Sequence, residues 1–200
     1  LLIATPLGIF AAIWLVEYAR RGSKLVKVVR VTTETLQGIP SIVYGLFGML
    51  FFVTKLHWGY SMIAGAFTLA IMVLPVIMRT TEEALIAVPD SYREGSFGLG
   101  AGKLRIIFHD IVPNALSPII VESTLRIGAC ILQISSLSFI GLGVQPPTPE
   151  WGSIMANGRD YIRDFYPLVT FPGIAIMLTL FGFNMFGDGL RDALDPRLKR

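Results

Sequence analysis

The sequence contains few charged residues, one cysteine and two histidines. Charged residues make up 16% of the 200, against about 25% in a typical soluble domain, while 53% are hydrophobic and the mean hydropathy is +0.64. The single cysteine, Cys130, excludes a disulfide framework and a zinc site built on cysteines. The histidines, His57 and His109, are too few and too isolated for a metal cluster. The composition therefore indicates an integral membrane protein, and no cofactor is expected.

Long stretches without charge mark the expected membrane spans. Charge-free windows of 20, 23 and 23 residues cover 35–54, 56–78 and 165–187, and a helix needs about 20 apolar residues to cross the hydrocarbon core of a bilayer. We expect another span at 107–133, although it is interrupted by charges, and a truncated span at the start of the chain. The expected fold is an all-α, polytopic transmembrane bundle forming one domain over residues 1–200, with about five spans at 1–16, 35–54, 60–78, 107–133 and 165–187.

The distribution of lysine and arginine predicts which connecting segments face the cytoplasm. Segments 17–34, 79–106 and 188–200 carry thirteen of these residues, whereas 55–59 and 134–164 carry three. Basic residues accumulate on the cytoplasmic side of membrane proteins, so we expect the first set to be cytoplasmic and the second extracytoplasmic. The net charge of +3 then reflects topology. Membrane lipid is the expected surrounding, and no nucleic-acid partner is expected.

The segment 79–106 is expected to contain two short helices. Thr80 with Glu83, and Ser91 with Glu94, have the spacing of a capping box, in which a hydroxyl and a carboxylate bond free N–H groups at a helix start. Pro89 separates the two expected helices because proline cannot continue a helix. The second helix is expected to end among the glycines at 95, 98, 100 and 102.

The triplet Glu94-Gly95-Ser96, followed by Gly100 and Pro113, resembles the Glu-Ala-Ala loop of ABC importer permeases. The resemblance implies a transmembrane bundle of the type I ABC importer kind, in which these five residues mark a coupling loop that fits a groove of a separate ATPase. The chain departs from the family pattern where Gly95-Ser96 replaces Ala-Ala. Each interior glycine costs a helix roughly 1 kcal/mol relative to alanine, so a floppier coupling helix is expected. The alternative is that Glu94 caps its own helix and the segment is an ordinary connector.

The two parts of the chain resemble two different importer permeases. Residues 1–93 resemble the permease of the phosphate importer, through segments 5–14, 38–48 and 74–85. From residue 104 to 200 the chain resembles the second permease of dipeptide, oligopeptide and nickel importers, through segments 104–108, 113–118, 136–152 and 187–197. Phosphate-type permeases place an arginine and a glutamate at positions that here are Ala129 and Gln133. A di- or oligopeptide, or nickel, is therefore the expected substrate, and phosphate is the alternative.

The resemblance also implies partners and a docking surface. Family members work in the bacterial inner membrane with a second permease chain, two ABC ATPase chains and an extracytoplasmic solute-binding protein. The segment 134–164 corresponds to the side on which the binding protein docks. A stiff proline stretch precedes a tryptophan there, and the candidate docking residues are Pro146, Pro147, Pro149 and Trp151. The alternative is that this segment only spaces two spans.

Glu122 and Arg126 are the charges expected inside a span. Each alone would cost roughly 2.5–3.5 kcal/mol at the bilayer centre, so we expect them to pair, as their i,i+4 spacing on one helical face permits. They either line the translocation path and meet the charged ends of a peptide, or form a neutral pair that orients the helix. Pro40 and Pro75 also lie inside expected spans and should kink them.

Two other classes of protein compete with the importer permease. An ion-coupled secondary transporter would need coupling carboxylates near the midplane, for which Glu122 alone is thin support, and the inverted repeats common in such folds are not evident. A membrane-embedded enzyme would need a nucleophile with a base, or a metal cluster, and we assign no catalytic residue. ATP hydrolysis is expected in a partner chain, because Phe97 and Leu104 stand where a phosphate-binding loop needs glycine and serine or threonine.

Overall fold

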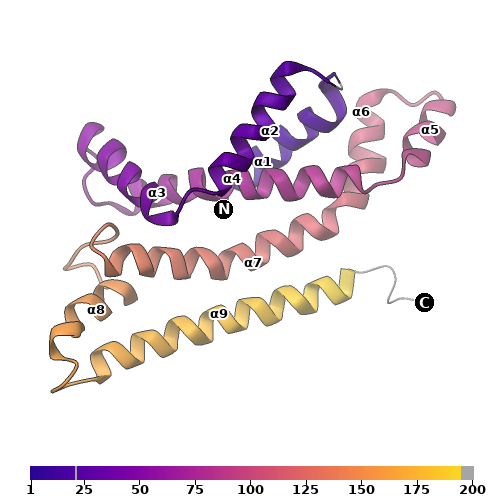
Figure 1. Ribbon diagram of the computed structural model, residues 1–200. Helices are drawn as coiled ribbons and strands as arrows, with labels where there is room; N and C mark the ends of the chain where they lie inside the picture. Colours follow the sequence, from indigo (N-terminus) through magenta and orange to yellow (C-terminus); the bar gives the residue numbers. More distant parts are fainter. Residues whose placement is uncertain (21, 195–200) are drawn as a thin grey trace. The chain divides into compact units, whose positions relative to one another are not determined.

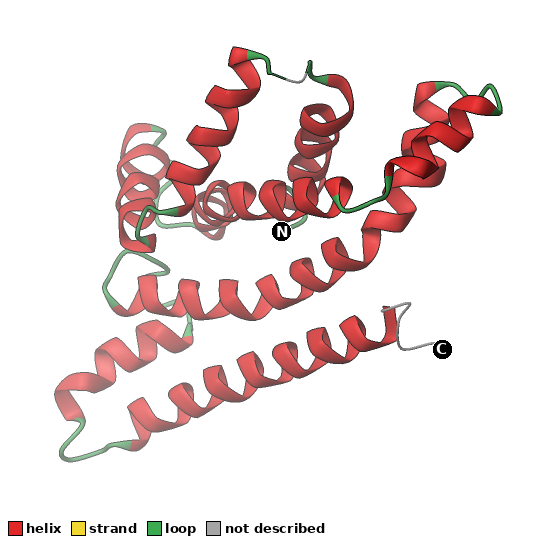
Figure 2. Cartoon of the chain, turned by 45° about the vertical axis from the view of Figure 1, so that its right-hand side comes forward, coloured by secondary structure: helices red, strands yellow, loops and turns green. Residues whose placement is uncertain are grey.

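The computed structural model describes residues 1–20 and 22–194, and this part of the chain forms helices and no strand (Figures 1 and 2). The α-helices are α1 (Ala4–Ile13), α2 (Lys24–Gln37), α3 (Ser41–Gly48), α4 (Met62–Ile86), α5 (Asp90–Gly98), α6 (Lys103–Arg105), α7 (Val112–Phe139), α8 (Trp151–Gly158) and α9 (Pro167–Leu194). Three π-helical segments extend α1, α3 and α6, and a 3-10 turn follows α8: η1 (Trp14–Tyr18), η2 (Met49–Lys55), η3 (Ile106–Ile111) and η4 (Arg159–Tyr161). The expected all-α fold is confirmed. Arg21 and the last six residues of the predicted tail, 195–200, lie outside the described residues.

Within the described residues, three helices are long and apolar enough to cross a membrane. They are α4, the continuous helix Lys103–Phe139 that joins α6, η3 and α7, and α9. The broken pair Lys24–Gln37 and Ser41–Lys55 is a fourth candidate, and Ala4–Tyr18 is a shorter apolar helix. Each of the five expected spans therefore corresponds to a helical segment, although several ends differ from the prediction.

The expected span at 35–54 is broken rather than only kinked at Pro40, because the helix stops between Gln37 and Ser41 and the two parts are bent by 98°. Pro40 is the N-cap residue of α3, with φ −58° and ψ 142°, rather than a residue inside a span. Proline has no N–H to donate and disfavours helical backbone in the residue before it, so the break falls where these constraints act. Pro75, in contrast, does lie inside α4 as expected.

The expected helix start at Thr80 is also wrong, since α4 continues unbroken to Ile86. Ile77, Thr81 and Leu85 follow one another at i, i+4 and i+8, and each is only 1% exposed. The helix continues past Thr80 because burying this face stabilises it more than a capping box would stabilise a new helix start. α7 and α9 likewise run past their expected ends, so residues 134–139 and 188–194 are helical rather than loop or tail.

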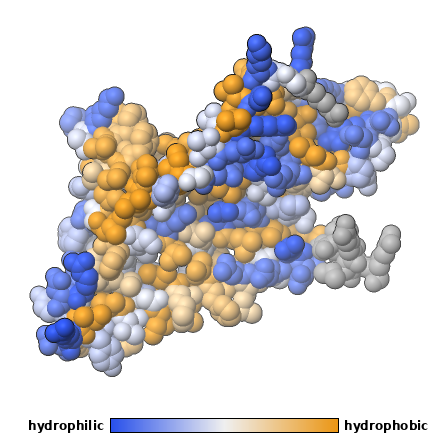
Figure 3. Space-filling model, viewed as in Figure 1, coloured by the Kyte–Doolittle hydropathy of each residue, from blue (hydrophilic) through white to orange (hydrophobic). Residues whose placement is uncertain are grey.

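The helices group into two compact units. The first contains Leu1–Gly38, Val73–Thr124 and the end of α9 from Gly187, and its core is a cluster in which Ala12, Ile107 and Ile111 are fully buried. Hydrophilic side chains gather on the surface of this unit around α2 and α6 (Figure 3). The second contains Ile39–Met72 and Leu125–Phe186. It holds a cluster of aromatic rings from Phe47, Phe51, Phe52, Trp58 and Phe67.

Candidate functional site

The short helix predicted for the coupling loop is α5, and it ends at a glycine as expected. The N–H groups of Gly100 and Ala101 donate to the carbonyls of Phe97 and Ser96 at 2.9 and 3.0 Å, which is the Schellman arrangement of a helix end. Gly100 has φ +79°, a left-handed conformation that glycine adopts without strain. The expected capping box is wrong, because α5 begins at Asp90 without a side-chain cap and Ser91 lies inside it.

Arg93 fastens α5 to the end of α4. Pro89 has no N–H, so it cannot donate to the carbonyl of Leu85 four residues earlier, and Arg93 Nη2 donates to that carbonyl at 3.0 Å. Arg93 Nη1 donates to the carbonyl of Val88 at 2.9 Å and to Asp90 Oδ1 at 3.0 Å. The guanidinium therefore satisfies carbonyl groups that the end of a helix leaves unpaired.

The same side chain joins α5 to η1. Arg93 Nε and Nη2 donate to Glu17 Oε1 at 3.1 and 2.8 Å, and the two side chains are only 19% and 10% exposed. All five N–H groups of the guanidinium thus have an acceptor. Sequence reasoning missed Arg93 and Glu17, which lie 76 residues apart. The signal that was available is Pro89, whose missing N–H leaves a helix carbonyl to be capped.

The far end of α5 is tied to η3. Ser96 Oγ donates to Asp110 Oδ2 at 2.8 Å, and α5 lies beside α6 in both ribbon views (Figures 1 and 2). Ser96 stands where the importer pattern has alanine, so its hydroxyl adds a hydrogen bond that alanine could not make. Lys103 Nζ lies 4.6 Å from the ring centroid of Tyr18, a cation–π distance. We call residues 87–105, with α5 at their centre, the elbow.

Apart from Arg93 and Ser96, the side chains of α5 are exposed to solvent. No residue of α5 is buried; Phe97 is 62% and Leu99 90% exposed, and Glu94 and Gly95 are exposed as well. An exposed apolar patch on a helix held in place is typical of a surface that binds another protein. The structure thus gathers Glu94, Gly95, Ser96 and Gly100 on the elbow. Pro113, the fifth predicted coupling residue, lies apart from them in the first turn of α7.

Glu122 and Arg126 lie one helical turn apart in the middle of α7, as predicted. Both are half-buried, and neither is without an interaction partner. Gln133 follows on the same face at i+11 from Glu122, because eleven residues make about three helical turns. Its Oε1 atom is buried with no hydrogen-bond partner among the described residues. Gln133 is therefore a further polar position on this face. In the sequence it was noted only as a position where phosphate-type permeases have a glutamate.

Residues 134–164 contain a folded segment rather than an open loop. Glu150 is the N-cap residue of α8, where Oε2 accepts from the N–H of Ser153 at 2.9 Å and Oε1 accepts from Ser135 Oγ at 2.8 Å. A Cβ added at Gly152 would meet the backbone of Ser135, so α8 packs tightly against the end of α7. The four candidate docking residues are exposed on and ahead of α8: Pro146, Pro147, Pro149 and Trp151.

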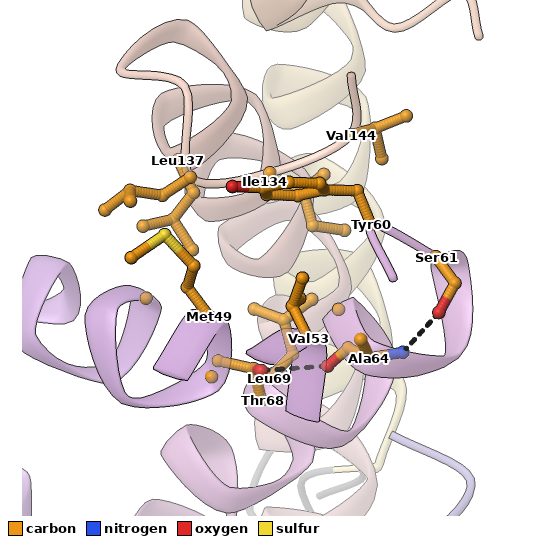
Figure 4. Close-up of a pocket in the computed structure, with 15 residues that line it drawn as sticks. Met49, Val53, Tyr60, Ser61, Ala64, Thr68, Leu69, Ile134, Leu137 and Val144 are labelled. Atoms are coloured by element: carbon orange, nitrogen blue, oxygen red, sulfur yellow. Dashed lines mark hydrogen bonds between the residues drawn. The ribbon is translucent and has the colours of Figure 1, made fainter. Parts of the chain in front are cut away.

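The second unit also holds a small hollow of about 60 Å³ between η2, α4 and the end of α7 (Figure 4). Two of its hydroxyl groups serve the local helix: Ser61 Oγ accepts from the N–H of Ala64 at 3.3 Å, and Thr68 Oγ1 donates to the carbonyl of Ala64 at 2.8 Å. The hollow therefore presents mainly apolar surface. Its lining includes Met49, Val53, Leu69, Ile134, Leu137 and Val144.

The all-α fold with several candidate spans defines a polytopic membrane protein, and sequence comparison identifies its class. Residues 4–200 match the family of binding-protein-dependent transport system inner membrane components, and the chain belongs to this family. The predicted resemblance to importer permeases is confirmed.

Named relatives are transport permeases for small peptides. The chain is 44% identical over 142 residues to the di/tripeptide transport system permease protein DppC of Pseudomonas aeruginosa, covering 70% of this chain and 47% of that protein. It is 40% identical over 168 residues to the dipeptide transport system permease protein DppC of Escherichia coli, covering 84% of this chain and 54% of that one. The chain thus spans about half the length of these relatives.

Solved structures show the same fold at low sequence identity. An inward-facing form of the MetNI methionine ABC transporter superposes with a TM-score of 0.80 at 19% identity, covering 97% of this chain and 88% of that chain. An amino acid ABC transporter crystallised with histidines gives a TM-score of 0.63 at 18% identity, covering 98% and 88%. At this identity the likeness supports the fold alone.

Proposed function

We propose that this chain forms part of the permease subunit of an ATP-driven importer in a bacterial inner membrane, and that the imported substrate is a di- or oligopeptide. Membership of the inner membrane component family supports the transport role. The identity of 40–44% to two DppC permeases supports a peptide substrate. The resemblance of residues 104–200 to peptide and nickel permeases points the same way, and phosphate and nickel become competing substrates in the test.

The observation that carries the proposal is the exposed helix α5 on an anchored elbow. A permease must receive motion from a separate ATPase through a surface that is both accessible and firmly attached. Phe97 and Leu99 supply exposed apolar contact area, and Glu94 supplies an exposed carboxylate beside them. In the proposal this surface docks on one of two ATPase chains in the cytoplasm, while a second permease chain completes the pathway.

The polar face of α7 is the proposed translocation path. A peptide carries an ammonium group at one end and a carboxylate at the other, and Glu122 and Arg126 offer the complementary charges one turn apart. Charged groups are held inside a membrane only where they pair or face a watery cavity. Gln133, on the same face, adds a neutral polar group. The proposed docking surface of the solute-binding protein, on the opposite side of the membrane, is formed by the exposed residues Pro146, Pro147, Pro149 and Trp151.

The full-length permease, assembled with its partners in proteoliposomes, tests this function. We expect ATP-dependent uptake of a labelled dipeptide in preference to phosphate and nickel. Phe97→Ser should reduce co-purification of the ATPase, whereas Tyr161→Ser, at a residue that is 59% exposed outside the elbow, should not. Uptake of phosphate instead of dipeptide would overturn the substrate, and uptake driven by a proton gradient without a bound ATPase would overturn the importer.

A further inference from the structure

The bonds of Arg93 reach three elements at once, which is more than a helix cap requires. We propose that Arg93 and Glu17 are positioning residues that make the elbow rigid, so that a displacement of α5 reaches η1 and the end of α4 as a motion of one body. This inference rests on the importer function proposed above and assigns the route by which its coupling surface acts on the membrane helices.

The backbone alone does not hold α5 at a fixed angle to α4. Only residues 87–89 separate the two helices, and Pro89 removes the N–H that would have continued the hydrogen bonding from Leu85. Such a joint, with free carbonyls, would act as a hinge. Arg93 makes this joint rigid, because its planar guanidinium bonds the carbonyl of Leu85 on α4 and that of Val88 in the connection, while its own backbone belongs to α5.

Glu17 extends this joint to the first helical segment of the chain. The carboxylate lies in η1, which ends one residue later at Tyr18, and it receives two of the five guanidinium bonds. The pair is largely shielded from water, and the core beneath it is tight, since Leu85 is 1% and Ile107 0% exposed. A buried ion pair with several charge-assisted bonds fixes geometry more strictly than a surface pair.

The other attachments of α5 are weaker by comparison. Ser96 and Asp110 share one hydrogen bond to η3, and Lys103 makes a single cation–π contact to Tyr18. The strong connection therefore leads from α5 to η1 and α4, the ends of two expected membrane spans. A lysine at position 93 has three donors on one nitrogen and cannot reproduce the fork of five.

The test compares transport with ATP hydrolysis in the full-length complex. Glu17→Gln should leave the complex assembled and the basal ATP hydrolysis unchanged, while the peptide imported per ATP falls by at least about fivefold, a typical coupling effect between two sites. Arg93→Lys should lower the same ratio. Arg79→Lys is the matched control. Arg79 is ion-paired with Glu34 on α2 and with Glu83 on its own helix, but it is 39% exposed and has no bond to α5 among the residues that the structure describes.

A second measurement keeps the inference independent of the substrate. Spin labels placed at Leu99→Cys and Phe10→Cys, in a Cys130→Ser background, report the distance between the elbow and α1. The distance distribution should be narrow in the parent protein and broad with Glu17→Gln. Equal widths, or an unchanged ratio of peptide to ATP in the Glu17→Gln complex, would overturn the rigid elbow. A parent complex without ATP-dependent uptake would instead overturn the proposed function, and the distance measurement would still decide the rigidity.

Discussion

Ser96 donates a hydrogen bond of 2.8 Å to Asp110, fourteen residues further along the chain, and so joins α5 to η3. This pair attaches the C-terminal part of α5, whereas Arg93 attaches its N-terminal part. An alanine at position 96, as in the importer pattern, would leave this connection to the backbone alone. The chain therefore compensates locally for the two glycines that weaken α5.

Ser96→Ala should loosen α5. Loss of one hydrogen bond costs about 1 kcal/mol, and the expected result is faster hydrogen exchange of the α5 amides in the purified full-length protein. Ser136→Ala is the control, because Ser136 Oγ donates only to the Leu132 carbonyl of its own helix at 2.8 Å. Unchanged exchange in α5 would show that the Ser96 bond does not hold the elbow.

Gly95→Ala and Gly98→Ala should each stabilise α5. A Cβ at either position would meet no atom within 4 Å, so each change removes the helix penalty of glycine, about 1 kcal/mol, without a clash. Slower exchange of the α5 amides would reveal the gain. Gly100→Ala is the opposite case, because its φ of +79° strains any other residue. Stabilisation by Gly100→Ala would contradict the described end of α5.

Gly48→Ala should destabilise the second unit. A Cβ there would overlap the side chain of Thr68, which is 6% exposed and bonded to the Ala64 carbonyl. Overpacking of this kind costs roughly 1–3 kcal/mol, visible as a lower melting temperature in detergent. Gly65→Ala, where the added carbon meets open space, should not lower it. A second change, Thr68→Gly, should restore part of the loss.

Glu82→Gln should cost more stability than Glu83→Gln, although both glutamates are ion-paired at 2.6 Å. Glu82 Oε1 pairs with Arg30 Nη2 and its side chain is 5% exposed, whereas Glu83 pairs with Arg79 and is 60% exposed. Neutralising a buried partner should cost about 2 kcal/mol or more, and a surface pair contributes at most about 1 kcal/mol. Equal melting temperatures of the two variants would show that the α2–α4 contact is not structurally important.

The fold was predictable because membrane spans are long apolar runs that need no tertiary information. The place of α5 was equally local, since Pro89 and Gly100 limit the helix on either side. The sequence predicted a kink at Pro40 but not the full break before Ser41, because an apolar run does not show whether a proline bends a helix or ends it. The capping box at Thr80 predicted a helix start that the structure does not have. The buried residues Ile77 and Leu85 keep α4 helical through this position.

The candidate site was only half visible in the sequence. The candidate coupling residues, such as the exposed Glu94, were proposed by resemblance to a motif with fixed spacing, and their role stays a prediction. The anchoring pair of Arg93 and Glu17 could not be found in this way, because its members are 76 residues apart and only folding brings them together. The same limit applies to Ser135 and Glu150, whose bond holds α8 against α7.

The central claim is that the elbow lies on the cytoplasmic side and binds an ATPase. Labelling of a thiol at position 99 tests it most directly. Leu99 is 90% exposed, so Leu99→Cys in a Cys130→Ser background offers an accessible thiol to a maleimide that cannot cross the membrane. The thiol should react only from the cytoplasmic side, and binding of the ATPase should protect it, whereas His57→Cys should react from the outside. Reaction of the Leu99→Cys thiol from the outside, or equal reaction with and without the ATPase, would contradict the account.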